Sequence, residues 1–142
     1  MTHEIPVQPL IFLKPTSSYV TEGNPIIIPS GCKNLHHEVE LGLVIGDSKP
    51  APLGAINNDN YREFIAGYVL ALDMTARDFQ ETAKKAGHPW ALAKAFDTSC
   101  AVGDLILTGT PSGVGQVKAG DVITGSLRDI KDESKVRDSE VA

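Results

Sequence analysis

The sequence has few cysteines and no long apolar run. Cys32 and Cys100 are the only two thiols among 142 residues, too few for a disulfide framework, and neither has a Cys or His partner at zinc-binding spacing. We therefore expect both thiols to be packed and chemically idle. Apolar runs such as Val69 to Leu72 fall far short of the roughly 20 residues needed to cross a bilayer, so no membrane partner is expected.

Basic residues are also scarce. Thirteen Lys and Arg against 18 Asp and Glu give a net charge of -5, and the basic residues do not cluster, so nucleic acid is not expected as a partner. The segment from Met1 to Pro9 lacks a basic start followed by an apolar block. No targeting segment is readable in these residues, which leaves the compartment open.

The composition is that of one folded domain. The chain is 42% hydrophobic and 22% charged, and 142 residues are long enough to bury a sizeable core. We assign residues 1–127 to a single domain. Residues 128–142 contain nine charged side chains of both signs and are predicted to form a disordered tail.

Proline and glycine divide the chain into short apolar segments that are rich in β-branched residues. Such segments are typical of strands. The predicted strands lie at residues 10–13, 26–28, 39–45, 65–72, 105–108 and 122–123. The fold class that follows is mainly β, with a smaller helical part.

One helix is well marked. Thr75 followed by Asp78 resembles a capping box, and Gly87 stands where a helix commonly ends. The spacing of the side chains predicts two faces. Phe79, Ala83 and Ala86 form the packing face, whereas Arg77, Gln80 and Lys84 form a polar face that points to solvent or into a site.

Two glutamates lie two residues apart in an apolar strand. On a strand, Glu38 and Glu40 point to one face while Val39 and Leu41 point to the other. The two carboxylates can therefore converge on one cation. The alternative is an amphipathic strand whose acidic face is solvated.

A third carboxylate, Asp73, ends the apolar segment 65–72 and directly precedes the helix. It is either a functional side chain at a strand end or a helix cap. Three carboxylates suit Mg²⁺ or Mn²⁺. His36 and His37 suggest zinc, but adjacent strand residues face opposite sides and no third nitrogen or sulfur ligand is evident.

Two further features could contact a ligand. Lys94 lies in a mainly apolar stretch, where it is either desolvated and available as a proton donor or extended to the surface. The glycine-rich segment 108–115 is either a backbone cradle for a ligand or a tight turn. It matches neither the P-loop nor the dinucleotide motif.

Four segments, taken in order, resemble the fumarylacetoacetate hydrolase family. They are NLHHEVELG at 34–42, LDMTARDFQ at 72–80, KAFD at 94–97 and LTGTPSGVG at 107–115. The similarity is closest to the acylpyruvases that also decarboxylate oxaloacetate. It implies a mixed β-sheet roll, a mitochondrial or cytosolic enzyme, and a homodimer.

The resemblance also implies roles for particular residues. The metal ligands of the family fall on Glu38, Glu40 and Asp73, and the ion is Mg²⁺ or Mn²⁺. The substrate, a small 2-oxo acid, would be bound by a set of four side chains. These are Arg77, Gln80, Lys94 and Thr110, of which Lys94 and Gln80 are the expected catalytic residues.

The sequence departs from the family pattern in two places. The His-Glu segment that activates water in the family is not among these residues, so weak hydrolysis is expected beside decarboxylation. Several dozen family residues are also missing between Cys100 and Val102. The competing hypothesis is a catalytically impaired variant that retains metal binding or pairs with full-length subunits.

Overall fold

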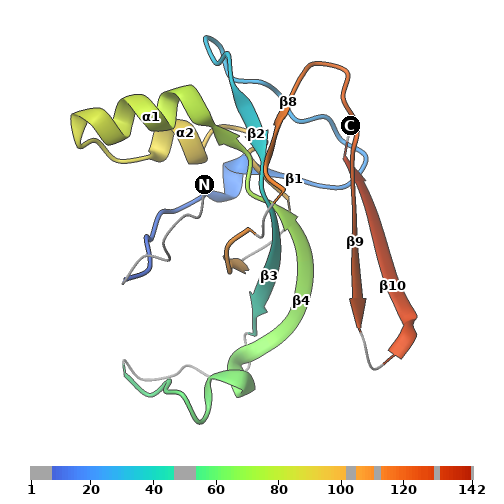
Figure 1. The fold of residues 1–142 in the computed structure, drawn as a ribbon. Helices are drawn as coiled ribbons and strands as arrows, with labels where there is room; N and C mark the ends of the chain where they lie inside the picture. Colours follow the sequence, from blue (N-terminus) through green and yellow to red (C-terminus); the bar gives the residue numbers. More distant parts are fainter. Residues whose placement is uncertain (1–7, 47–53, 102–104, 111–112, 130–131, 142) are drawn as a thin grey trace.

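The chain folds into short open sheets with helices at one end (Figure 1). The computed structural model describes residues 8–46, 54–101, 105–110, 113–129 and 132–141. The elements in chain order are η1 (Thr16–Ser18), β1 (Tyr19–Val20), β2 (Leu35–His37), β3 (Val39–Ile45), η2 (Tyr61–Phe64), β4 (Ile65–Leu72), β5 (Thr75–Ala76), α1 (Arg77–Ala86), α2 (Ala91–Lys94), β6 (Cys100–Ala101), β7 (Leu105–Leu107), β8 (Gly115–Val117), β9 (Ile123–Asp129) and β10 (Asp132–Val141). The predicted strand-rich α+β class is confirmed.

The sheet β4-β3-β7 is the main support of the structure. Its two longer strands, β3 and β4, have the bounds that the sequence predicts, because branched and aliphatic side chains favour extended backbone there. They pair antiparallel, with Val39 opposite Leu72 and Glu40 opposite Ala71. A register shift between Val44 and Ile45 ends the regular pairing.

A second sheet, β5-β2-β8, continues from the first. Only Glu38 separates the end of β2 from the start of β3, so one extended stretch of chain serves both sheets (Figure 1). In β2, Leu35 pairs with Ala76 of β5 on one side and with Val117 of β8 on the other. Ala76, the N-cap of α1, is thereby held against β2, the strand that directly precedes Glu38.

Helix α1 ends as the sequence predicts but begins differently. Gly87 adopts φ 68° and its N–H donates to the last turn, as a helix-ending glycine does. The predicted capping box is wrong: Thr75 lies in β5, and the N-cap Ala76 makes no side-chain hydrogen bond. Asp78 instead accepts a hydrogen bond from the backbone N–H of Lys33, at 2.8 Å.

The apolar core is small and lies beneath the junction of the two sheets. Leu35, Leu72 and Met74 form its buried centre. Cys100 is buried and Cys32 only partly buried, and neither forms a disulfide, so the expectation of a packed thiol is confirmed for Cys100 alone. Part of the β3 and β4 surface stays uncovered by the described residues, with exposed Leu41, Ile45 and Tyr68.

Three further predictions about the fold are wrong. Residues 10–13 form no strand, because their backbone pairs with no other strand among the described residues. Residues 26–28 form none either, and the Ile27 N–H donates to the Thr98 hydroxyl instead. Within the expected tail 128–142, residues 132–141 instead form β10, since antiparallel backbone pairing with β9 does not require apolar side chains.

No helix among the described residues is long and apolar enough to cross a membrane.

Candidate metal centre

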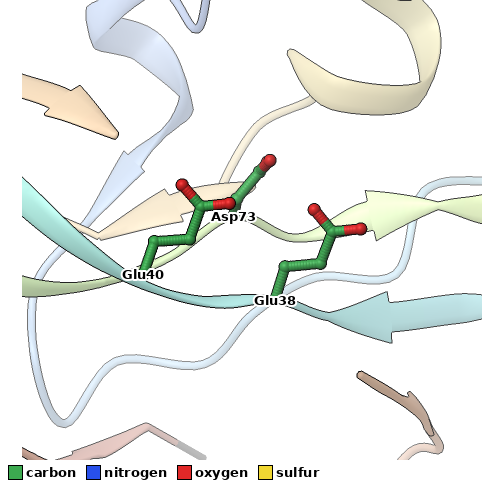
Figure 2. A group of neighbouring side chains, drawn as sticks. All are labelled: Glu38, Glu40 and Asp73. Carbon is green, nitrogen blue, oxygen red and sulfur yellow. The ribbon is translucent and has the colours of Figure 1, made fainter. Parts of the chain in front are cut away.

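Three carboxylates converge where the two sheets join. Glu38 lies between β2 and β3, Glu40 lies in β3, and Asp73 directly follows β4. One oxygen of each lies within 4.8 Å of the others, and the three side chains extend to the same side of the chain (Figure 2). Their exposed fractions are 9%, 5% and 1% in that order. The structure thus brings together the three carboxylates singled out in the sequence.

Strand pairing explains this convergence. Val39 of β3 pairs with Leu72, the last residue of β4. Asp73, which follows Leu72, therefore lies beside Glu38, and its N–H donates to the Glu38 carbonyl at 2.8 Å. Glu40 follows on the same face of β3. The alternative of a solvated acidic face is wrong, since Leu41 on the opposite face is 38% exposed and Glu40 only 5%.

Lys94, the last residue of α2, extends into this cluster. Its side chain is 3% exposed, so the alternative of a lysine reaching the surface is wrong. Lys94 Nζ donates to Glu38 Oε2 at 2.7 Å, to Asp73 Oδ2 at 2.5 Å and to the Thr75 hydroxyl at 2.6 Å. The ammonium therefore lies between two of the three carboxylates, above the ring of Phe12.

A second lysine, Lys14, reaches the same cluster and was not identified from the sequence. Its Nζ lies 2.8 Å from Asp73 Oδ1, and its side chain is only 6% exposed. The one available signal was a lysine placed between the apolar run 10–13 and Pro15. That pattern alone does not distinguish a buried lysine from a solvated one.

The first turn of α1 contributes two polar side chains. Arg77 donates to Glu38 Oε1 at 2.6 Å and to Gln80 Oε1 at 2.7 Å. Gln80 is 3% exposed, so this part of the polar helix face points inward. Lys84, the third member of that face, instead lies over the Trp90 ring.

The glycine-rich segment contacts the site through its first residues. The Gly109 N–H donates to Glu40 Oε2 at 2.9 Å, and Gly109 adopts φ 103°, which favours glycine. The Thr110 hydroxyl donates to the Val39 carbonyl at 2.9 Å. Thr110 therefore lies beside the cluster with its hydroxyl proton already engaged. Residues 111 and 112 lie outside the described part of the chain.

Burial and neighbouring charges shift the pKa values of the three carboxyls differently. Burial raises the pKa of Asp73, although Lys14 and Lys94 oppose the shift. The pKa of Glu40 is also raised, first by burial and then by the charges of the other two carboxylates. At Glu38, burial acts in the same direction, but Lys94 and Arg77 outweigh it and lower the pKa.

The residues present fit a hard divalent cation. The cluster offers carboxylate oxygens, the ligands that Mg²⁺ and Mn²⁺ prefer. Asp73 Oδ1 is buried and accepts no well-aligned hydrogen bond within the described part of the chain, although Lys14 lies at ion-pair distance. The described histidines are not part of the cluster, and His36 Nε2 is 2.9 Å from Asn34 Oδ1.

Comparison with known proteins identifies the class. The family model for the fumarylacetoacetate hydrolase C-terminal domain matches residues 1–103. The chain therefore belongs to the fumarylacetoacetate hydrolase family, a family of enzymes.

Two curated relatives act on oxaloacetate according to their names. The chain is 39% identical to the mitochondrial oxaloacetate tautomerase fahd-1 of Caenorhabditis elegans, over 88% of this chain and 81% of the relative. It is 37% identical to the mitochondrial oxaloacetate decarboxylase of Dictyostelium discoideum, over 85% of this chain and 78% of the relative. The first alignment spans 178 residues, more than the chain contains, so the relative has segments without a counterpart here.

A solved structure with the same fold holds a metal ion. Fumarylpyruvate hydrolase from Pseudomonas aeruginosa, in complex with Mn²⁺ and pyruvate, superimposes with a TM-score of 0.74 at 25% identity. The match covers 92% of this chain and 76% of that structure.

Proposed function

We propose that this chain acts on oxaloacetate through an enolate, with Mg²⁺ or Mn²⁺ held by Glu38, Glu40 and Asp73. The observation that carries the proposal is the convergence of three buried carboxylates within 4.8 Å, with the Lys94 ammonium among them. The names of the curated relatives support the substrate. Tautomerisation and decarboxylation are both included, because each develops negative charge on the 2-oxo oxygen.

When bound, the divalent ion would supply the positive charge that stabilises the developing negative charge on a 2-oxo acid. Mn²⁺ is the better first choice in an experiment, because the Pseudomonas aeruginosa neighbour was solved with that ion. Mg²⁺ has the same preference for oxygen ligands and is expected to replace it.

The chain's own side chains would position the substrate and move the proton. The Lys94 ammonium, which three acceptors hold in place, would neutralise charge on the substrate and deliver a proton to the substrate carbon. In tautomerisation the neutral lysine would then take up the proton that leaves the enol oxygen, and in decarboxylation it would regain a proton from solvent. Gln80 and Thr110 would fix the orientation of the substrate. Arg77 would shape the entrance, since its guanidinium already links Glu38 to Gln80.

Two assays on the purified chain test the proposal. The decay of the enol absorbance of oxaloacetate measures tautomerisation, and pyruvate formation measures decarboxylation. Each is run with Mn²⁺, with a chelator and on Glu40→Gln. The matched control is Glu81→Gln, which changes an exposed glutamate of α1. We expect metal-dependent conversion by the unaltered chain and by Glu81→Gln, and at least a 100-fold loss in Glu40→Gln.

Acetylpyruvate is the second substrate to test, because the metal-containing structural neighbour is a fumarylpyruvate hydrolase. Hydrolysis additionally needs a base that activates water, a requirement that oxaloacetate conversion does not share. We expect oxaloacetate to react faster than acetylpyruvate, because the named relatives act on oxaloacetate. If neither substrate shows metal-dependent turnover, the chain is instead an impaired, metal-binding member of its family.

We also propose a mitochondrial location and a homodimer. The location rests on the two curated relatives, both of which are named mitochondrial proteins. The homodimer rests on the family resemblance alone. Fractionation of cells tests the first, and light scattering on the purified chain tests the second.

A further inference from the structure

Lys14 connects segments that are far apart in the sequence. Its Nζ lies within hydrogen-bond distance of the Met74 carbonyl at 3.3 Å, of the Ser99 carbonyl at 3.0 Å and of the Ser99 hydroxyl at 3.1 Å. It also donates to the Lys94 carbonyl. These acceptors lie 60 to 85 residues away along the chain. One ammonium thus contacts three backbone carbonyls, those of Met74, Lys94 and Ser99, close to the acidic cluster.

The backbone around Lys14 is itself fixed. Pro15 restricts the residue before it to extended conformations. The turn that follows, η1, is closed by the Ser18 N–H and hydroxyl, which donate to the Pro15 carbonyl at 2.9 Å and 2.6 Å. Ser18 is fully buried. The lysine therefore extends from an anchored segment rather than from a free end of the chain.

Asp73 is held between two ammonium groups. Lys94 Nζ binds Oδ2 at 2.5 Å, and Lys14 Nζ lies 2.8 Å from Oδ1. Rotation of the Asp73 carboxylate would break at least one of these contacts. Because Lys14 also binds the Lys94 backbone, it relates the position of a proposed metal ligand to that of a proposed proton donor.

We propose that Lys14 is a positioning residue of this site, which orients Asp73 for the divalent ion and sets Lys94 relative to it. The inference rests on the proposed function. The opposite role is a lysine that acts only as a repelling charge, and the two roles predict opposite effects. Loss of an orienting partner weakens metal affinity, typically 10–100-fold. Loss of a repelling charge strengthens it.

The test measures the binding of Mn²⁺ to the full chain. The electron paramagnetic resonance signal distinguishes the free from the bound ion and so monitors binding. For Lys14→Met we expect a dissociation constant raised about 10-fold or more and an altered bound-ion spectrum. The control is Lys85→Met, which changes an exposed lysine of α1 and should leave both unchanged. Circular dichroism and thermal melting show whether each variant is folded at the temperature of measurement.

Ser99→Ala is the second variant, and it decides the matter if Lys14→Met does not fold. It leaves the charge of the site unaltered, but removes a hydroxyl that accepts from Lys14 and donates to the Lys94 carbonyl at 3.0 Å. A positioning role predicts Mn²⁺ binding that is weakened severalfold. Unchanged or tighter binding in folded Lys14→Met, or in Ser99→Ala if Lys14→Met is unfolded, would overturn the inference. If the unaltered chain itself binds no Mn²⁺, the proposed function fails instead.

Discussion

Lys94 Nζ lies 2.7 Å from Glu38 Oε2, inside a cluster that also fits a divalent cation. The ammonium and a bound ion would therefore share carboxylates. Without the ion, the lysine balances part of the negative charge of the cluster, so that the three carboxylates can be buried together.

Replacement of Lys94 by Met should make the fold depend on metal. Removing one partner of a buried ion pair typically costs about 3–5 kcal/mol, because the remaining charge is uncompensated. Mn²⁺ would restore positive charge. We expect the melting temperature of Lys94→Met to fall without metal and to rise more on addition of Mn²⁺ than that of the unaltered chain. Calorimetry with and without chelator measures both.

The control for this variant is Lys118→Met, since the Lys118 side chain is exposed. It should melt like the unaltered chain in both conditions. A Lys94→Met chain that melts normally and gains nothing from Mn²⁺ would show that the ammonium does not balance the cluster.

A matched pair of glycine variants distinguishes the effect of backbone strain on stability from its effect on metal binding at the site. Gly109 and Gly120 both have positive φ, 103° and 90°, and neither would bring a Cβ within 4 Å of another group. Alanine at either position should cost about 1–3 kcal/mol of stability. Only Gly109 donates to Glu40. Isothermal titration with Mn²⁺ should therefore show weakened binding for Gly109→Ala and normal binding for Gly120→Ala, whereas equal affinities would contradict this.

Asp78, in the first turn of α1, should make the stability of the fold depend on pH. Burial opposes ionisation, but hydrogen bonds from the Lys33 N–H and the Cys32 thiol lower the pKa of Asp78 below its usual value. A lowered pKa in the folded state stabilises the fold above the unfolded pKa, and this contribution is lost as the pH falls through the folded pKa. Asp78→Asn should therefore cost about 1 kcal/mol at pH 7, and less as the solution is acidified.

Urea denaturation at pH 7 and at successively lower pH measures this difference. Glu81→Gln, on the exposed side of the same helix, is the control and should show no such trend. A destabilisation by Asp78→Asn that stays constant into the acid range would contradict an ionised, hydrogen-bonded Asp78.

The two thiols should differ in reactivity. Burial raises the pKa of Cys100 to about 11, so roughly one chain in 1,000 carries the thiolate at pH 8. Cys32 is only partly buried. We expect iodoacetamide to label Cys32 first, and Cys100 only after denaturation, as followed by mass spectrometry. Cys32→Ser should then remain unlabelled while folded. Rapid labelling of that variant would contradict the burial of Cys100.

Much of the site could be predicted because strand alternation is simple. The spacing of Glu38 and Glu40 placed both side chains on one face, and Asp73 stood at the end of the next strand. Their burial could not be predicted from the same pattern. It depends on the first turn of α1 and on α2, which bring Arg77 and Lys94 over the acidic face.

Other parts depended on long-range contacts that no local pattern reveals. Lys14 is buried only because carbonyls 60 or more residues away accept its hydrogen bonds. The sequence predicted that Asp78 forms part of a capping box, yet its carboxylate accepts a hydrogen bond from the backbone N–H of Lys33. At residues 10–13 the apolar pattern predicted a strand, but a strand also requires a partner.

The pairing of β3 with β4 has a consequence for folding errors. Acidic and aliphatic side chains alternate at the start of β3, so a shift of one residue in its pairing would present Val39 and Leu41 where Glu38 and Glu40 now stand. Such a chain could still form a sheet, but it would have no place for the ion. Metal binding would therefore favour the correctly paired strands over the misaligned ones and act as a check on assembly.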